Sequence, residues 1–198
     1  MAVVQIPNLP TAATLTGTEQ LEIVQAGVSC RTTTQEVADL AAPILSFAGY
    51  NGAFNSTVTQ TSGGATTANT VSFNNTVSSS GVSVTASTRI TATNPGTYLL
   101  RFTLQAYTTT SGNDDIDVWV AQNGSNIGNT TIRSTLTVAN QACTISGGVL
   151  VTLAAYGYVE VKWSSSDVNM RLLTASGLTN PSRPSMASAM ATLTLVQE

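Results

Sequence analysis

The sequence predicts an all-β fold: an antiparallel jelly-roll sandwich, preceded by an extended N-terminal arm that carries a small hairpin and one short helix. Apolar and polar residues alternate in short runs from Phe54 onward, and turns rich in Gly, Asn and Ser separate these runs. Period-two alternation is the pattern of strands with one buried face, and many such strands between turns indicate a sandwich or jelly roll. No strong helical periodicity follows Ile44.

The N-terminal segment is expected to begin in an extended form, because Pro7 and Pro10 restrict the backbone and remove hydrogen-bond donors. The run from Leu21 to Val24 then indicates a short strand. Gly27 permits a turn, and the residues from Val28 to Thr32 can run back as the partner strand. The segment therefore predicts a small hairpin after an extended opening.

A short helix is expected directly after the hairpin. The run Thr33-Thr34-Gln35-Glu36 fits a capping box, in which Thr33 caps the helix and Glu36 reaches back to it. Apolar residues at helical spacing follow, namely Val37, Leu40 and Ala41. Pro43 disfavours helical backbone in the residue before it, so the helix is expected to end at about Ala42.

The chain is expected to contain an arm, a linker and a domain. Residues 1–45 form the docking arm, residues 46–53 a linker with Gly49 and Gly52, and residues 54–198 the jelly roll. The arm is too small to bury a core of its own, so it must pack on neighbouring protomers or on a docking surface. The apolar side chains expected to make that contact are Leu9, Leu15, Leu21, Ile23, Val28, Val37 and Leu40.

The clearest strand of the domain runs from Thr97 to Tyr107, after a turn at Asn94-Pro95-Gly96. Its apolar residues from Tyr98 to Ala106 share one face, which is typical of antiparallel sheets with one buried side. Further long strands are expected at Ile116–Val120, which leads to an Asn123-Gly124 hairpin turn, and at Val149–Leu153, Val159–Trp163 and Ala189–Leu195. Shorter candidates are Phe54–Thr59, Thr70–Phe73, Val82–Thr85 and Arg89–Thr93.

The composition favours assembly with other protein surfaces. Charged residues make up 9% of the chain, against roughly 25% in a typical soluble domain. The alternative is a β-rich monomer that uses Thr and Ser on its solvent faces. A net charge of −3 and the lack of any Lys/Arg run exclude an electrostatic case for nucleic acid or for an anionic membrane surface. The uncharged stretch Ala142–Val159 contains three glycines and fits buried strands better than a membrane helix.

The sequence predicts that the protein is not an enzyme and holds no cofactor. It contains no histidine, which removes the commonest general base and metal ligand. Its single lysine, Lys162, is expected to face solvent from the middle of a strand. The rival class, a glycan depolymerase, needs two carboxylates about 5 to 10 Å apart. The carboxylates available in the domain, apart from Glu198, are Asp114, Asp115, Asp117, Glu160 and Asp167.

Asp114, Asp115 and Asp117 form the densest acidic group and are the weak candidates for a calcium site. Calcium takes six to eight oxygens. Asp114 is expected on the opposite strand face from the other two, and no downstream glutamate completes a loop. No bound metal is therefore expected. Cys30 and Cys143 are expected to be free, buried thiols.

Several aromatic residues are candidates for a carbohydrate platform or a subunit contact: Tyr98, Tyr107, Tyr156, Tyr158, Trp119 and Trp163. Most such residues in a β domain lie in the core or at an interface. We expect Tyr98 and Trp163 in the core. Tyr156 and Tyr158 lie in a turn, which makes them the candidates for a trimer or receptor contact.

From Ala53 to Glu198 the chain resembles the globular heads of complement and tumour-necrosis-factor-like proteins. The resemblance rests on Gly96-Thr97-Tyr98, on Val118 to Gly124, on Leu153, Gly157 and Val159, and on the final strand Thr192 to Leu195. It implies a compact jelly roll that trimerises, binds partners through the trimer surface and catalyses nothing. That family also sometimes carries calcium near the trimer apex. Tyr158 stands where the family usually has an acidic residue, which puts a ligand role for that turn in doubt.

A second resemblance is to tailed-phage virion proteins. Leu9-Pro10, Leu15 to Glu19, Val24 to Val28, Arg31-Thr32-Thr33 and the short helix resemble an N-terminal segment of fibres, head appendages and capsid decorations. Asp117 to Val120, Asn123-Gly124, Trp163 to Ser165 and Asn169 to Leu172 resemble the jelly roll of phage appendage proteins. The resemblance implies a virion location.

The sequence thus supports the hypothesis of a non-enzymatic virion structural protein. Its arm docks on the capsid or tail, and its jelly roll projects as a homotrimer in a capsid decoration or head fibre. The alternative is a tail fibre or receptor-binding tip that recognises a host cell-surface glycan. The arm fits both hypotheses.

Overall fold

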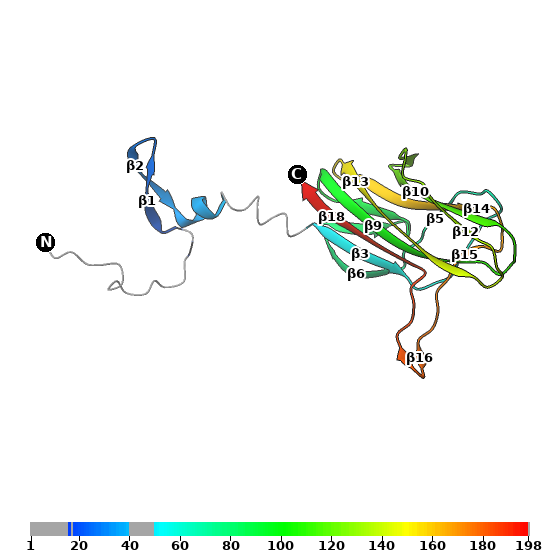
Figure 1. Ribbon diagram of the computed structural model, residues 1–198. Helices are drawn as coiled ribbons and strands as arrows, with labels where there is room; N and C mark the ends of the chain where they lie inside the picture. Colours follow the sequence, from blue (N-terminus) through cyan, green and yellow to red (C-terminus); the bar gives the residue numbers. More distant parts are fainter. Residues whose placement is uncertain (1–15, 17, 40–49, 198) are drawn as a thin grey trace. The chain divides into compact units, whose positions relative to one another are not determined.

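The computed structural model describes residues 16, 18–39 and 50–197 (Figure 1). The chain divides into two compact units, Met1–Ser46 and Phe47–Glu198. The first holds a hairpin and one short helix, and the second is a β-sandwich. Of the predicted arm residues, Leu9, Leu15 and Leu40 lie outside the described residues, as do the extended opening and the end of the helix.

The predicted hairpin is confirmed. Strands β1 (Gln20–Gln25) and β2 (Val28–Thr33) pair antiparallel along their whole length. The two residues between them have positive φ angles, 52° at Ala26 and 80° at Gly27. Positive φ angles at both central residues are the conformation that favours two-residue hairpin turns, and glycine adopts it without a steric cost.

The predicted capping box is also confirmed at the start of the helix, which occupies residues 34–39. The Glu36 amide donates to Thr33 Oγ1 at 3.1 Å, and the Thr33 amide donates to Glu36 Oε2 at 2.8 Å. Glu19, the residue just before β1, links the start of the hairpin to the helix. Its carboxylate accepts the Thr34 hydroxyl at 2.6 Å and the Thr16 amide at 2.6 Å. The hairpin and the helix are thereby tied together through polar groups.

The second unit is built from two seven-stranded sheets. The β9 sheet has the order β4-β15-β9-β18-β3-β6, with β13 also pairing β9. The β14 sheet has the order β11-β10-β14-β8-β7, with β12 pairing β10 and β5 pairing β14. The long strands are β3 (Asn51–Ser56), β6 (Asn75–Ser80), β7 (Val82–Thr85), β8 (Arg89–Ala92), β9 (Gly96–Tyr107), β10 (Asp114–Gln122), β12 (Ile132–Leu136), β13 (Ala142–Leu153), β14 (Tyr158–Ser165) and β18 (Ala189–Gln197). The two-residue strands are β4 (Gln60–Thr61), β5 (Asn69–Thr70), β11 (Ser125–Asn126), β15 (Arg171–Leu172), β16 (Leu178–Thr179) and β17 (Ser182–Arg183).

The strand order is that of a jelly roll, which confirms the predicted fold class. The chain alternates between the sheets, so that β3, β18, β9 and β13 are neighbours in one sheet. β8, β14, β10 and β12 are neighbours in the other, and all of these pairings are antiparallel. Eight strands in two such interleaved sheets define the jelly roll.

The core lies between the sheets and follows the period-two pattern. In β9 every second residue from Tyr98 to Ala106 is buried, and the residues between them face outward. Val159, Val161 and Trp163 of β14 are fully buried from the opposite sheet. Tyr98 and Trp163 are therefore core residues, as predicted, and the Tyr98 hydroxyl donates to the Asn94 carbonyl at 2.9 Å.

Two glycines explain where strand boundaries differ from those that the sequence predicts. Residues 51–53, expected in the linker, belong to β3, so that assignment was wrong. Gly52 is buried, and a Cβ there would lie 2.5 Å from the Phe54 ring. Gly96 opens β9 with φ 149°, a conformation that residues with a side chain rarely adopt, and a Cβ there would also lie 2.8 Å from the Gln197 carbonyl oxygen of β18. Both glycines permit a close approach within a sheet, and Gly52 belongs to β3 rather than to the predicted linker.

Other elements were missed or mis-sized by the sequence pattern. β6 is exposed at every position and β12 alternates weakly, so neither has the signature of a buried strand. β13 begins at Ala142, seven residues before the predicted Val149. The sequence pattern missed its first half because the early inward positions include Cys143 and Gly147. The β16–β17 hairpin projects from the sandwich between β15 and β18 (Figure 1).

The uncharged stretch from residue 142 to 159 forms β13, a turn and the start of β14, as predicted. None of the helical residues that the structure describes belongs to a helix long and apolar enough to cross a membrane.

The Glu19 contacts make the first unit sensitive to acid. Hydrogen bonds from Thr34 and then Thr16 lower the pKa of Glu19 from 4.5 to about 2. Because the folded pKa is depressed, this contribution to stability is complete above pH 4.5 and is lost as the pH falls through about 2. An NMR titration of the Glu19 carboxyl is expected to show a midpoint near 2. In Thr34→Val, which lacks the main donor, the midpoint should rise toward 4.5; equal midpoints near 4.5 in both proteins would contradict the contact.

Candidate functional site

The acidic residues at the start of β10 divide between the two faces of the strand. Asp114 is buried, and its Oδ2 accepts the Thr108 hydroxyl at 2.6 Å. Asp115 and Asp117 face outward, where Arg133 of β12 lies opposite Asp117. Arg133 donates from Nε and Nη2 to the two oxygens of Asp117, each at 2.7 Å. This bidentate pair lowers the pKa of Asp117, so its carboxylate stays ionised at neutral pH.

This division separates the three calcium candidates. Within the part of the chain that the structure describes, no three acidic or cysteine side chains gather in a way that could hold a metal ion. The Thr110 hydroxyl lies 3.1 Å from Asp114 Oδ2 and 3.3 Å from Asp167 Oδ2, which brings two of the domain's carboxylates to one hydroxyl.

Cys30 and Cys143 are free thiols, as predicted, but both are partly exposed rather than buried.

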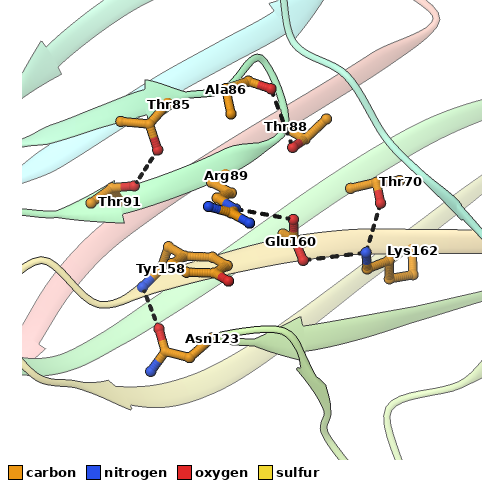
Figure 2. A network of polar contacts seen from close by, with 10 residues as sticks. All are labelled: Thr70, Thr85, Ala86, Thr88, Arg89, Thr91, Asn123, Tyr158, Glu160 and Lys162. Atoms are coloured by element: carbon orange, nitrogen blue, oxygen red, sulfur yellow. Dashed lines mark hydrogen bonds and ion pairs between the residues drawn. The ribbon is translucent and has the colours of Figure 1, made fainter.

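The outward face of the β14 sheet carries a connected set of ionic contacts (Figure 2). Glu160 lies at its centre, with its side chain only 8% exposed, between Arg89 at 3.6 Å and Lys162 at 3.2 Å. Lys162 also donates to the Thr70 hydroxyl of β5 at 2.7 Å. Lys162 was expected to face solvent freely; its side chain is 22% exposed because Glu160 and Thr70 hold it against the sheet.

Of the two tyrosines predicted in a turn, Tyr156 lies in the turn before β14, whereas Tyr158 is the first residue of β14. Tyr156 has φ 61° and is 73% exposed. Tyr158 is half-buried, and the Arg89 guanidinium lies 4.5 Å from the centre of its ring (Figure 2). The Tyr158 amide donates to Asn123 Oδ1 at 2.9 Å, which joins this turn to the Asn123-Gly124 turn. Tyr158 is therefore part of the fixed polar face, and Tyr156 is the residue of the pair that is open to a partner.

The outward face of the β9 sheet is almost without charge. Arg101 is the single charged residue among the outward positions of β13, β9, β18 and β3, and it has no ion-pair partner among the described residues. Leu150 of β13 is 63% exposed and pairs with Leu99 of β9. Met190 and Val196 of β18 are also exposed. Large apolar side chains on a charge-poor face are the marks of a protein contact surface.

The hairpin of the first unit presents an apolar face of its own. Cross-strand partners share a face, so the pairs Leu21–Thr32, Ile23–Cys30 and Gln25–Val28 place Leu21, Ile23 and Val28 on the same side. These three predicted docking residues are exposed, and so is Val37 of the helix, which was also predicted to dock. The unit therefore has no buried core of its own among its described residues, in line with its expected dependence on another surface.

A shallow hollow of about 360 Å³ lies on the outward side of β10, beside the loop that joins β11 to β12. Trp119 lines it together with the polar residues Asp117, Asn126, Asn129, Thr131 and Ser164. Trp119 Nε1 donates to Asn126 Oδ1 at 2.8 Å. Trp119 was among the aromatic candidates in the sequence, but its polar neighbours come from separate segments and carry no motif that would have identified them.

No protein-family model matches the chain. No curated protein matches it in sequence. Among solved structures, the chain is similar to an Eiger TNF from S. frugiperda, at 10% sequence identity and a TM-score of 0.49. That similarity covers 76% of this chain and 94% of the other.

The central position of Glu160 predicts a measurable role in stability. Glu160→Gln keeps the side-chain volume but leaves Lys162 and Arg89 without their counter-charge. Because Lys162 is largely buried and Arg89 is half exposed, we expect the free energy of unfolding to fall by about 1–2 kcal/mol. Chemical denaturation measures this change. The matched control Asp115→Asn removes a more exposed carboxylate, 3.5 Å from Arg133, and should cost less than about 0.5 kcal/mol; equal losses would refute the central role.

Proposed function

We propose that this protein is a non-enzymatic structural component of a tailed-phage virion. Its N-terminal unit docks on the particle, and its jelly roll projects as a homotrimer in a capsid decoration or head fibre. The observation that carries the proposal is the contrast between the two outward faces of the sandwich. One face is charged and internally paired, whereas the other is charge-poor and exposes large apolar side chains.

The charge-poor face of the β9 sheet is the proposed surface of association. Burying it removes Leu150, Met190 and Val196 from water, and each fully buried apolar side chain of this size stabilises by about 1.5–3 kcal/mol. Arg101 is the one charge on these strands that must be accommodated. The charged face of the β14 sheet is unsuited to this role, since six ionic groups would lose their hydration there. The number three comes from the resemblance to complement-head and tumour-necrosis-factor-like domains.

The N-terminal unit is the proposed attachment device. Its hairpin and helix are fixed by the capping box and by the Glu19 contacts, yet Leu21, Ile23 and Val28 remain exposed on one face. A rigid element with an exposed apolar face is suited to dock into a groove of another protein. In a trimer three such contacts act together, so a weak single contact gives strong attachment. The resemblance of this segment to those of phage virion proteins supports a particle as the partner.

The absence of catalysis in this proposal is supported by the chemistry of the chain. Without histidine, an acid–base mechanism would depend on carboxylates. Glu160 and Asp117 are each held by cations, and Asp114 by the Thr108 and Thr110 hydroxyls. These contacts tie the carboxylates into the structure, including Asp117, which lines the hollow beside Trp119.

A second candidate function is a tail fibre or receptor-binding tip that recognises a host cell-surface glycan. The hollow beside Trp119 favours it, because an aromatic side chain with several uncharged hydrogen-bonding neighbours is a common composition for a small-ligand site. Both candidate functions use the same trimer and the same N-terminal attachment.

The trimer proposal predicts the outcome of a single charge placed on the association face. Sedimentation of the intact chain at low micromolar concentration is expected to give three times the 20.4 kDa chain mass. Leu150→Asp buries an unpaired carboxylate in every interface, so we expect dissociation to rise about 100-fold or more and monomers to dominate. The control Ser83→Asp adds the same charge on the outward face of the β14 sheet and should leave the trimer intact. A wild-type monomer, or equal effects of both changes, would overturn the proposal.

The docking proposal predicts a separate loss. The double variant Ile23→Asp, Val28→Asp places charges on the apolar face of the hairpin, so we expect particle binding to fall at least about 10-fold while the trimer persists. Binding is measured by co-sedimentation with particles that lack the protein, and electron microscopy locates the wild-type protein on the capsid or the tail. The control Glu22→Gln changes the opposite face of β1. Unchanged binding of the double variant would contradict docking through this face.

A further inference from the structure

We propose that the hollow beside Trp119 is a binding site for a neutral pyranose sugar. The inference deepens the second candidate function, on which it rests, by naming the site and the class of ligand. It does not depend on where the protein sits in a particle.

On the outward face of the β14 sheet, several unpaired polar side chains gather at the hollow. Elsewhere on this face Glu160, Lys162 and Arg89 are bound to protein partners. In contrast, the side chains of Asn129, Thr131 and Ser164, which line the hollow, form no hydrogen bond to any of the described residues. One amide and two hydroxyls are therefore available to a ligand in one small region.

Trp119 supplies the apolar part of the site. Its ring nitrogen is already satisfied by Asn126 at 2.8 Å, so what the side chain offers to a ligand is its aromatic surface. Pyranose rings have one face of C–H groups and a rim of hydroxyls. An aromatic surface next to hydrogen-bonding side chains matches that division, as in other sites where one end is apolar and the other is polar.

Asp117 adds an acceptor without adding a free charge. Arg133 binds both of its oxygens at 2.7 Å, and each oxygen keeps a lone pair for a sugar hydroxyl. An anionic sugar would have to approach this carboxylate, whereas a neutral sugar meets only acceptors and donors. Because Arg133 also lies 3.5 Å from Asp115, the three side chains together carry one net negative charge, which selects against acidic sugars.

The loop that forms the other side of the hollow is held in place by the sheet. The Ile127 amide donates to the Val120 carbonyl at 2.9 Å, and the Val120 amide donates to Thr130 Oγ1 at 3.1 Å. Thr130 in turn donates to the Ile127 carbonyl at 2.8 Å. A loop fixed in this way loses little conformational freedom when a ligand binds. The hollow, at about 360 Å³, lies at the small end of the range for ligand sites, roughly 300–1,000 Å³, which fits one or two sugar rings.

The tryptophan content of the chain gives a direct measurement. The protein has two tryptophans, and Trp163 is fully buried in the core, so a ligand-induced change in fluorescence reports on Trp119. The intact chain is titrated with the methyl glycosides of glucose, galactose, mannose and N-acetylglucosamine. Glucuronic acid and N-acetylneuraminic acid are the anionic comparison. At least one neutral glycoside is expected to bind with a Kd on the order of 1 mM, and calorimetry confirms the stoichiometry.

Two variants locate the site. Trp119→Ala should weaken binding at least about 10-fold, the loss of roughly one good aromatic contact. Ser164→Ala removes a half-buried hydroxyl of β14 that forms no hydrogen bond to any described residue, so it should weaken binding several-fold without changing the thermal unfolding temperature. It keeps the test decisive if Trp119→Ala is unstable. The matched control Tyr156→Ala removes an exposed aromatic outside the hollow and should bind normally.

The inference is overturned if no neutral glycoside binds up to about 50 mM, well above the expected Kd. It is also overturned if acidic sugars bind better, or if Tyr156→Ala lowers affinity while Trp119→Ala and Ser164→Ala do not. The same variants are tested for trimer mass and for particle binding. A protein that forms normal trimers and attaches to the particle but binds no sugar would refute the sugar site and leave the proposed virion role intact. A protein that binds sugar but attaches to no particle would support the sugar site and refute the virion role.

Discussion

The burial of one face of each sheet against the other is the constraint on which the rest of the molecule depends. Side chains alternate along a strand, so fixing Tyr98, Leu100 and Leu104 in the core of β9 fixes Arg101 on its outward face. The same rule in β14 buries Val161 and Trp163 and forces Lys162 and Glu160 outward. The composition of the two outer surfaces therefore follows from the register of the core, and a shift by one residue would exchange core and surface in every strand.

This constraint explains which parts of the fold could be predicted from the sequence. Strands β9, β14 and β18 alternate strongly because they cross the middle of the sandwich, and their positions were predicted to within a few residues. The capping box and the hairpin turn at Ala26-Gly27 depend on neighbouring residues, so local sequence was sufficient. β6 has no buried residue, and the start of β13 has only Ile145 as a large apolar residue at an inward position, so pairing with β3 and β9 is what makes them strands.

The candidate sites were predictable to a smaller extent, for a physical reason. Asp114, Asp115 and Asp117 are adjacent in sequence, and the alternation rule was enough to separate them onto two faces. Glu160, however, pairs with Arg89 of β8 and Lys162 of β14, and Lys162 in turn donates to Thr70 of β5, 92 residues away along the chain. The hollow likewise joins Asp117 of β10 to Ser164 of β14 and to the loop before β12. A polar group that forms only when distant strands pair leaves no local pattern. This is also why Lys162 was expected to be free.

Covering the two outward faces with another protein therefore has opposite effects on the free energy. On the β14 sheet the ionic groups are already satisfied within one chain, so covering that face with another protein would cost their remaining hydration and return little. On the β9 sheet the outward groups of β9 and β18 are mainly threonines and large apolar side chains, with Arg101 as the one charge, so removing this face from water is favourable. This asymmetry is the physical basis for the proposal that the chain associates through the β9 sheet and keeps the β14 sheet toward solvent. In the proposed trimer the hollow beside Trp119 consequently stays accessible, because it lies on the face that gains nothing from self-association.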